Sequence, residues 1–288
     1  VIMSSFKDFA QNMLPDGADP SNPYRPAGAT FDDLSINVTV DHIDPEVRNC
    51  FAGYNEIDLM WPCALDNAAI AHELFHVISN FIVDDSSADD DFTGDEKEAG
   101  AIDEGLSDYF GLRYADDVST LVEYVAAEFG LPELTRKILA LSPAEVAYPF
   151  MTYFEPNNKA VEDNHLLGAK LANILWTMRM QLNSSEQKMF DQAMIKGLRR
   201  YAYLVTSPGS ASATNPYRIA PSDFQTFYIQ IYKSLDGNPS FPKTKLATFR
   251  DLLYNQARIG TAVGGASYQQ AGFLIARSES KVCVAGAG

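Results

Sequence analysis

The sequence predicts an α+β fold in which a small mixed lobe at residues 1–98 precedes a mainly helical lobe at residues 99–288. Two observations lead to this prediction. Apolar and polar residues alternate over 36–40, which is typical of a half-buried strand, and the segment 55–60 favours a second strand. From Asp66 onwards, apolar residues recur with a helical period through most of the chain. The length of 288 residues is ample for a hydrophobic core.

Composition and charge argue against several kinds of partner. The net charge of −16 and the pI near 4.5 disfavour binding to nucleic acid or to an anionic membrane surface. No run approaches the ~18 uninterrupted apolar residues of a membrane span, so we expect none. The chain begins at Val1 without a visible signal peptide or an initiator Met, which indicates a processed or trimmed form. We expect a monomer.

Three cysteines are too few for a disulfide scaffold. Cys50 and Cys63 are close enough in the sequence to pair, which would leave Cys283 over. The cysteine count alone does not decide between this disulfide and free thiols, so both alternatives stay open.

The helical part of the chain divides into segments separated by turn-rich loops. Asp66 or Asn67 is the candidate N-cap of a helix whose apolar residues run from Ala69 to Phe81. A second helix covers roughly 99–114. Further helices are expected over 4–14, 119–128, 133–141, 166–182, 185–204, 221–234 and 248–257. Loops such as SPGSASATNP and LDGNPSFPKTK separate the later helices.

An acidic insert joins the first two long helices. It weakly resembles a calcium-binding loop at four positions: Asp89, Asp91, Thr93 and Gly94. In such a loop a Glu binds the ion with both oxygens, but Gly100 stands at this position. A bound Ca²⁺ is therefore an alternative that matching ligands do not support, and a solvated acidic loop is the interpretation we favour.

His72 and His76 are four residues apart on the expected helix, so their imidazoles lie on one face, a single turn apart. Both can reach one tetrahedral Zn²⁺ at ~2.0–2.1 Å. Glu73 is rotated by ~100° around the helix, where it can miss the metal and reach a water molecule beside it. The alternative is a pair of structural histidines on a half-buried helix.

A catalytic zinc needs a third protein ligand and one open coordination position. Glu104 follows His76 by 28 positions, on the second expected helix, and Asp108 lies one turn further on the same face. The carboxylate of Asp108 can accept the free N–H of a ligand His and fix its orientation. The alternative, an exposed ion-pairing face, fits poorly because apolar residues flank both acids: Ile102, Leu106, Tyr109 and Phe110.

Two segments together resemble a known family. HELFH at 72–76 and GAIDEGLSDYFG at 100–111 are similar, in this order, to the zinc-binding motifs of the thermolysin-like (gluzincin) zinc metallopeptidases. The resemblance implies a zincin fold with the active-site cleft between the two lobes. It also implies a zinc-dependent endopeptidase that hydrolyses bonds of a peptide or protein substrate. We expect an extracytoplasmic or secreted location.

The resemblance assigns a role to each matched residue. It implies one catalytic Zn²⁺ with three ligands, His72, His76 and Glu104. It implies Glu73 as the general base that activates the water at the zinc, and Asp108 as the residue that orients a ligand histidine.

Upstream, NCFAGYNEIDLM at 49–60 resembles the edge strand of the same family. There Asn49 and the backbone near Phe51 and Ala52 would bind an extended peptide. This is strand addition, in which main-chain hydrogen bonds give affinity without reading the sequence of the peptide.

Downstream, EDNHLLGAKLANILWTM at 162–178 resembles the family segment whose histidine donates to the oxyanion. This places His165 at the start of a helix with a catalytic role, the alternative being a lone surface histidine. Glu162 or Asp163 can orient its imidazole, although the acid of the family lies further upstream.

The chain departs from the family pattern in several places. The acidic insert lengthens the spacer between the zinc motifs and contains no tyrosine, so the second oxyanion donor has no evident counterpart. Ala68 and Ala115 stand where the prototypes have calcium-binding acids. Arg136 is a candidate for the arginine that contacts substrate, and we interpret His42, which follows a strand and precedes a turn, as structural.

Two rival functions remain. One is a zinc-bound pseudopeptidase or peptide-binding module without catalysis, which the intact Glu73 and His165 disfavour and the missing tyrosine favours. The other is an interaction domain in which the HELFH segment is accidental, which the second motif makes a poor explanation.

Overall fold

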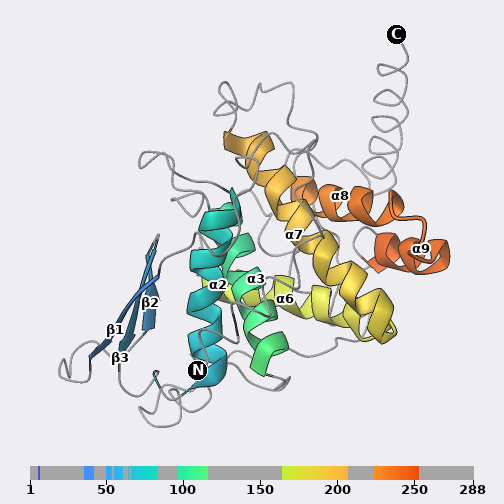
Figure 1. Cartoon of the computed structure of the whole chain (residues 1–288). Coiled ribbons are helices and arrows are strands. Elements are labelled where there is room, and N and C mark those ends of the chain that lie inside the picture. Colours follow the sequence, from blue (N-terminus) through green and yellow to red (C-terminus); the bar gives the residue numbers. More distant parts are fainter. Residues whose placement is uncertain are drawn as a thin grey trace. The chain divides into compact units, whose positions relative to one another are not determined.

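The computed structural model describes residues 6, 36–41, 50–53, 55–60, 64, 66–83, 97–115, 164–206 and 223–252. Over these residues the chain is mostly helical with one small three-stranded sheet, which confirms the predicted α+β class (Figure 1). Its contacts define two compact units. Among the described residues, unit 1 comprises those up to 115 and those from 164 to 195, and unit 2 comprises those from 196 to 252. The predicted division into lobes at residue 98 stays a prediction, and the helices on either side of it belong to unit 1.

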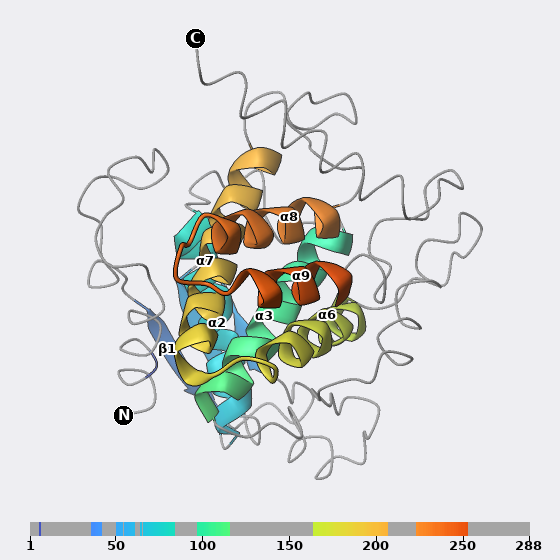
Figure 2. The ribbon, with the colours of Figure 1, turned by 90° about the vertical axis from the view of Figure 1, so that its right-hand side faces the viewer.

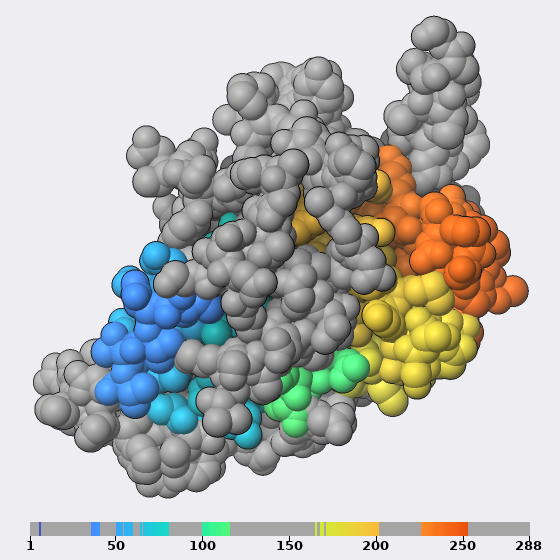
Figure 3. All heavy atoms as spheres, in the orientation of Figure 1, coloured from blue at the N-terminus to red at the C-terminus, as the bar shows by residue number. Residues whose placement is uncertain are grey.

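The sheet of unit 1 consists of β1 (Asn37–Asp41), β2 (Cys50–Ala52) and β3 (Glu56–Met60), in the order β1-β3-β2. β1 pairs with β3 in parallel and β2 pairs with β3 antiparallel. Ile57 and Leu59 of β3 are buried, as alternation across a strand requires when one face packs on a core. Their partners in the register, Val38 and Val40, are 39% and 63% exposed on the outer strand β1, which lies at the surface in Figure 3.

Cys50 of β2 is buried and takes part in a disulfide bond. The pairing with Cys63 stays a prediction, because Cys63 lies outside the described residues. β2 packs against the first long helix, so the covalent bond is formed beside that helix.

Helix α2 (Asn67–Val83) begins where the sequence places an N-cap. Oδ1 of Asp66 accepts hydrogen bonds from the backbone N–H groups of Ala68 at 2.8 Å and Ala69 at 3.0 Å, so Asp66 rather than Asn67 is the cap. The apolar face predicted for this helix is buried: Ala69, Ile70, Leu74, Val77 and Ile78.

Helix α3 (Lys97–Ala115) packs against α2 and also against α6 (Asn164–Arg179). The rings of Phe75 and Phe110 stack at 4.6 Å between α2 and α3. Tyr109 meets Trp176 edge-on at 5.5 Å between α3 and α6. Because α3 is covered on both sides, most of its described side chains are buried and none is exposed, so acids on it are largely taken out of water.

Helix α7 (Ser184–Thr206) begins with a capping box. Oδ1 of Asn183 accepts the N–H groups of Ser185 and Glu186, and Oε2 of Glu186 accepts the N–H of Asn183 at 2.9 Å. In unit 2, α8 (Asp223–Asp236) and α9 (Lys243–Asp251) pack side by side (Figure 2).

The predicted start of α9 at residue 248 is wrong, because the helix begins at Lys243 inside the segment assigned to a loop. Pro242 is the N-cap, with φ of −65°, and its carbonyl accepts the N–H groups of Lys245 and Leu246. Proline fits here because the first turn of a helix needs no N–H from it and its fixed φ suits the helix start. The prolines of this loop therefore mark a helix start as well as a turn.

Several predictions fall outside the described residues. These are the helices over 119–128 and 133–141, the acidic insert with its calcium alternative, the segment after 252, and the residues His42, Asn49, Arg136, Glu162 and Asp163. The helix expected over 4–14 is described only at Phe6, which is buried against Tyr114. In the described part of the chain, no helix is both long enough and apolar enough to cross a membrane.

Candidate metal centre

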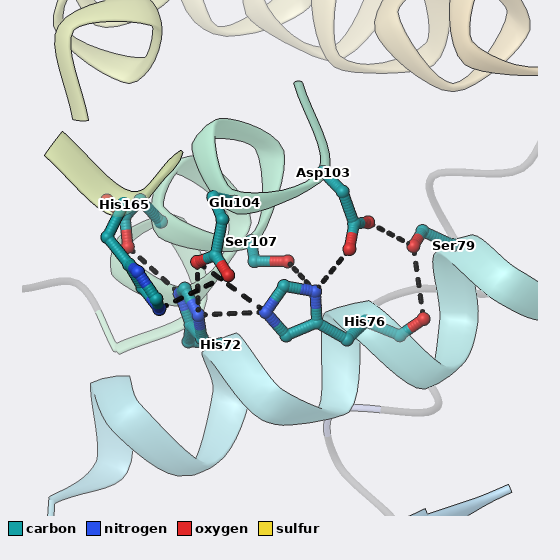
Figure 4. Close-up of polar contacts among 8 residues, drawn as sticks. His72, His76, Ser79, Asp103, Glu104, Ser107 and His165 are labelled. Carbon is teal, nitrogen blue, oxygen red and sulfur yellow. Dashed lines mark hydrogen bonds and ion pairs between the residues drawn. The ribbon is translucent and has the colours of Figure 1, made fainter. Parts of the chain in front are cut away.

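Helices α2 and α3 bring together the three residues predicted as metal ligands. Ligand atoms of His72, His76 and Glu104 all lie within 4.8 Å of one another. Nε2 of His72 is 3.0 Å from Nε2 of His76, and Oε2 of Glu104 is 3.2 Å and 3.8 Å from these two nitrogens (Figure 4). The two imidazole rings meet at 82°, and the short distances show that both Nε2 atoms lie beside the Glu104 carboxylate. The cluster can hold one metal ion.

The donor set fits a cation of the zinc type. Two imidazole nitrogens and one carboxylate oxygen are ligands that Zn²⁺ accepts with tetrahedral geometry, leaving a fourth position open. Oε2 of Glu104 is buried, and the Nε2 atoms of His72 and His76 lie 3.2 Å and 3.8 Å from it. A buried carboxylate is costly unless its charge is paired, and a cation bound to all three side chains would pair it when both histidines are neutral.

Asp108 lies behind His72, where the sequence places an orienting acid. Its Oδ1 is 2.9 Å from Nδ1 of His72, and the residue is fully buried. The alternative of an exposed ion-pairing face is therefore wrong. With its Nδ1 facing a carboxylate, His72 is held with Nε2 toward Glu104.

His76 has its own carboxylate partner, Asp103, which sequence reasoning missed. Oδ2 of Asp103 is 2.6 Å from Nδ1 of His76, and Oγ of Ser107 is 3.1 Å from the same nitrogen. Oγ of Ser79 donates to Oδ1 of Asp103, so the acid is itself held in place (Figure 4). Sequence reasoning could have found this partner. A histidine that binds a metal almost always donates its second N–H, so two ligand histidines need two acceptors.

His165 lies at the second position of α6 and joins the cluster from that helix. Its Nε2 is 3.3 Å from Oε1 of Glu104. The side chain is 46% exposed, compared with 16% for Glu104 and 5% for His72. The structure thus places His165 at the more exposed side of the centre.

Glu73 is half-buried on α2, one residue after His72. Its negative charge contributes to raising the pKa of His76, so the carboxylate is close to the centre. Of the residues predicted to bind peptide, Phe51 is 47% exposed on β2 and Ala52 is half-buried, while Asn49 lies outside the described residues. Their role in binding a peptide stays a prediction.

The acids and histidines of the centre shift one another's pKa. Burial lowers the pKa of His76, but the charges of Asp103 and Glu104 outweigh this effect and raise it to about 10. Burial likewise opposes protonation of His72, whose pKa is nevertheless raised by its contacts with Asp108 and Glu104. Burial favours the neutral form of Glu104, yet the charges of His76 and His72 hold its pKa well below the usual range.

We compared the chain with models of known protein families, with curated proteins and with solved structures, and none of them matched. The two sequence motifs and the geometry of the cluster that they form are therefore the basis for a function.

Proposed function

We propose that the protein is a zinc-dependent endopeptidase with a zincin fold of the thermolysin-like type. The observation that carries the proposal is the convergence of His72, His76 and Glu104 on one point, with a carboxylate behind each histidine. Three protein ligands are typical of a catalytic zinc, whereas structural zinc sites use four.

The side chains divide into those that would hold the ion and those that hold the ligands. His72 and His76 would bind through Nε2, and Glu104 through a carboxylate oxygen. Asp108 lies 2.9 Å from Nδ1 of His72 and Asp103 lies 2.6 Å from Nδ1 of His76, so each Nδ1 would carry a proton and each Nε2 would be left free to bind. When bound, Zn²⁺ supplies a Lewis acid that polarises the scissile carbonyl and lowers the pKa of water from 15.7 toward ~7.

Glu73 and His165 supply the remaining chemistry. The Glu73 carboxylate accepts a proton from the attacking water and passes it to the leaving amine. Nε2 of His165 lies 3.3 Å from a carboxylate oxygen, which only accepts hydrogen bonds, so we assign an N–H to this nitrogen. The same N–H donates to the oxyanion that develops on the substrate, a contact worth roughly 2.7–4 kcal/mol in other enzymes.

The substrate is a peptide or protein in extended form, lying in the cleft between the two lobes along the strand that contains Phe51 and Ala52. The location is extracytoplasmic or secreted. The disulfide at Cys50 supports this location, because disulfides persist in oxidising compartments and are rare in the cytosol.

Metal analysis and one conservative variant test the function. We expect one Zn²⁺ per chain, and cleavage of casein or of a peptide library by the wild-type protein. Glu73→Gln keeps the size of the side chain and removes the base, so cleavage should fall by about 10²–10⁴-fold at full zinc occupancy. If wild type and variant are equally inert on every substrate, the peptidase proposal is overturned.

A zinc-bound peptide-binding module is the second candidate, and the absence of a tyrosine from the acidic insert favours it. In that case the zinc-loaded protein would bind library peptides with an affinity that Glu73→Gln leaves unchanged, and it would cleave none of them.

A further inference from the structure

The backbones of α3 and α6 touch at two buried glycines. A Cβ atom on Gly105 would lie 2.6 Å from the carbonyl oxygen of Gly168 and 2.8 Å from Cδ2 of Leu171. A Cβ atom on Gly168 would lie 2.7 Å from Cβ of Glu104 and 2.7 Å from the backbone nitrogen of Gly105. Real Cβ atoms essentially never approach other atoms within 3.0 Å, so only glycine fits at both positions.

The crossing point lies beside two residues of the metal centre. Gly105 directly follows Glu104 in α3. Gly168 follows His165 by three residues in α6, and residues three apart are neighbours on a helix surface. The separation of the two helices at the glycines therefore determines how close His165 comes to Glu104.

The distances show that this separation matters. Ordinary contact of a Cβ begins at 3.4 Å, so a methyl group on Gly105 would require a displacement of about 0.8 Å from the Gly168 carbonyl. His165 Nε2 is 3.3 Å from Glu104 Oε1, close to the outer limit of a hydrogen bond. The same displacement would break this contact, and a misplacement of ~1 Å can cost ~10²-fold in rate.

We propose that Gly105 and Gly168 are positioning residues, which allow α6 to approach α3 closely enough to hold His165 against Glu104. The catalytic consequence rests on the proposed function, in which His165 donates to the oxyanion. The contact between His165 and Glu104 does not depend on that function, so it can be tested separately.

The first test uses the metal-free protein at one pH and measures the imidazole ¹⁵N resonances. The chain has four histidines, and His165→Ala identifies the signals of His165. We expect Glu104→Gln to shift the Nε2 resonance of His165 in the otherwise wild-type protein. In the Gly168→Ala background the contact is already lost, so Glu104→Gln should leave that resonance unmoved.

Gly197→Ala is the matched control. Gly197 is also a buried helical glycine, and a Cβ there would lie 2.7 Å from Cγ1 of Ile231, but both residues belong to unit 2. This variant introduces comparable crowding away from the metal centre. In the Gly197→Ala background, Glu104→Gln should therefore still shift the Nε2 resonance of His165. A shift of equal size in the folded Gly168→Ala protein overturns the proposal.

Gly105→Ala provides a second variant if Gly168→Ala does not fold. Part of its crowding comes from Cδ2 of Leu171, so Leu171→Val in the same protein removes that atom and leaves the clash with the Gly168 carbonyl. We expect the same loss of coupling between Glu104 and His165, and retained coupling would contradict the inference.

The second test is kinetic and uses the zinc-loaded protein. Gly168→Ala should lower kcat by about 10²-fold with little change in KM, because an oxyanion donor acts in the transition state. In the His165→Ala background, Gly168→Ala should cause no further loss, whereas an equal loss in both backgrounds counts against positioning. If wild type cleaves nothing, the proposed function fails, while the resonance test still decides the role of the glycines.

Discussion

Oδ2 of Asp103 lies 2.6 Å from Nδ1 of His76, and the two residues are 27 positions apart in the sequence. Asp103 is 2% exposed and is bound by Ser79 from the same helix that carries His76. The acid therefore fixes His76 from behind while its neighbour Glu104 faces the Nε2 side. Both ligand histidines are held in this way, which makes the cluster a set of oriented ligands before an ion binds.

Asp103→Asn should lower the affinity for zinc by about 10–100-fold, since outer partners of ligand histidines typically contribute this much. Asparagine is equal in size but weakens the bond to Nδ1 by removing the charge. Competition with a chromophoric chelator measures the dissociation constant. The control is Asp236→Asn at the end of α8, where Asp236 forms an exposed ion pair with Lys243 of α9. This variant should leave the dissociation constant of zinc unchanged, and equal effects of the two variants would contradict the role of Asp103.

Zinc binding should release protons. The pKa of His76 is raised to about 10 by Asp103 and Glu104 after the opposing effect of burial, so its imidazole is protonated in the metal-free protein at pH 8. Because the ligand must be neutral, the ion displaces that proton, and the apparent affinity should rise tenfold per pH unit for each proton released. Calorimetry in buffers of different ionisation enthalpy counts the protons, and a count of zero at pH 8 would refute the expectation.

The same shift makes the stability of the metal-free protein depend on pH. An unfolded His titrates near 6.5, whereas His76 titrates near 10 in the folded chain. A raised histidine pKa contributes stability that is fully present below pH 6.5 and is lost as the pH rises through about 10. Thermal melts of the metal-free protein should show a falling Tm across this window, and Asp103→Asn should flatten the curve.

Tyr109→Phe should destabilise the protein by about 1–3 kcal/mol. The hydroxyl of Tyr109 donates to Oδ1 of Asp191 at 2.6 Å, and both residues are fully buried, so the variant leaves a buried carboxylate short of a donor. Tyr228→Phe is a matched control, because in the described chain the equally buried hydroxyl of Tyr228 has no hydrogen-bond partner. Urea unfolding should show a loss for Tyr109→Phe and no loss for Tyr228→Phe.

The parts that could be predicted from the sequence are those encoded locally. The spacing of His72 and His76, the cap at Asp66 and the period of the apolar residues all act within one or two turns of α2. Each is visible in a window of about a dozen residues, which is why the start of α2 and the two histidines on one of its faces were predictable. Glu104 follows His76 by 28 positions and was expected because a second motif matched.

The parts that were missed depend on contacts between distant segments. Asp103 is an ordinary helical acid until α3 packs on α2 and sets it against His76. The parallel pairing of β1 with β3 could not be predicted, because the alternation of residues in either strand carries no direction. Judged by helix propensity alone, Gly105 destabilises α3. Its role is visible only in the fold, where the lack of a Cβ lets Gly168 of α6 approach closely.

The unequal exposure of the centre has a kinetic consequence. His72 and Glu104 have side chains 5% and 16% exposed, and His165, at 46%, stands at the more open side. In the proposed enzyme the fourth coordination position stays open for the substrate, so a small chelator should reach the bound ion from the side of His165. We expect the rate of zinc loss to rise with the concentration of chelator. A rate independent of chelator concentration would mean that the centre has to open before the ion leaves.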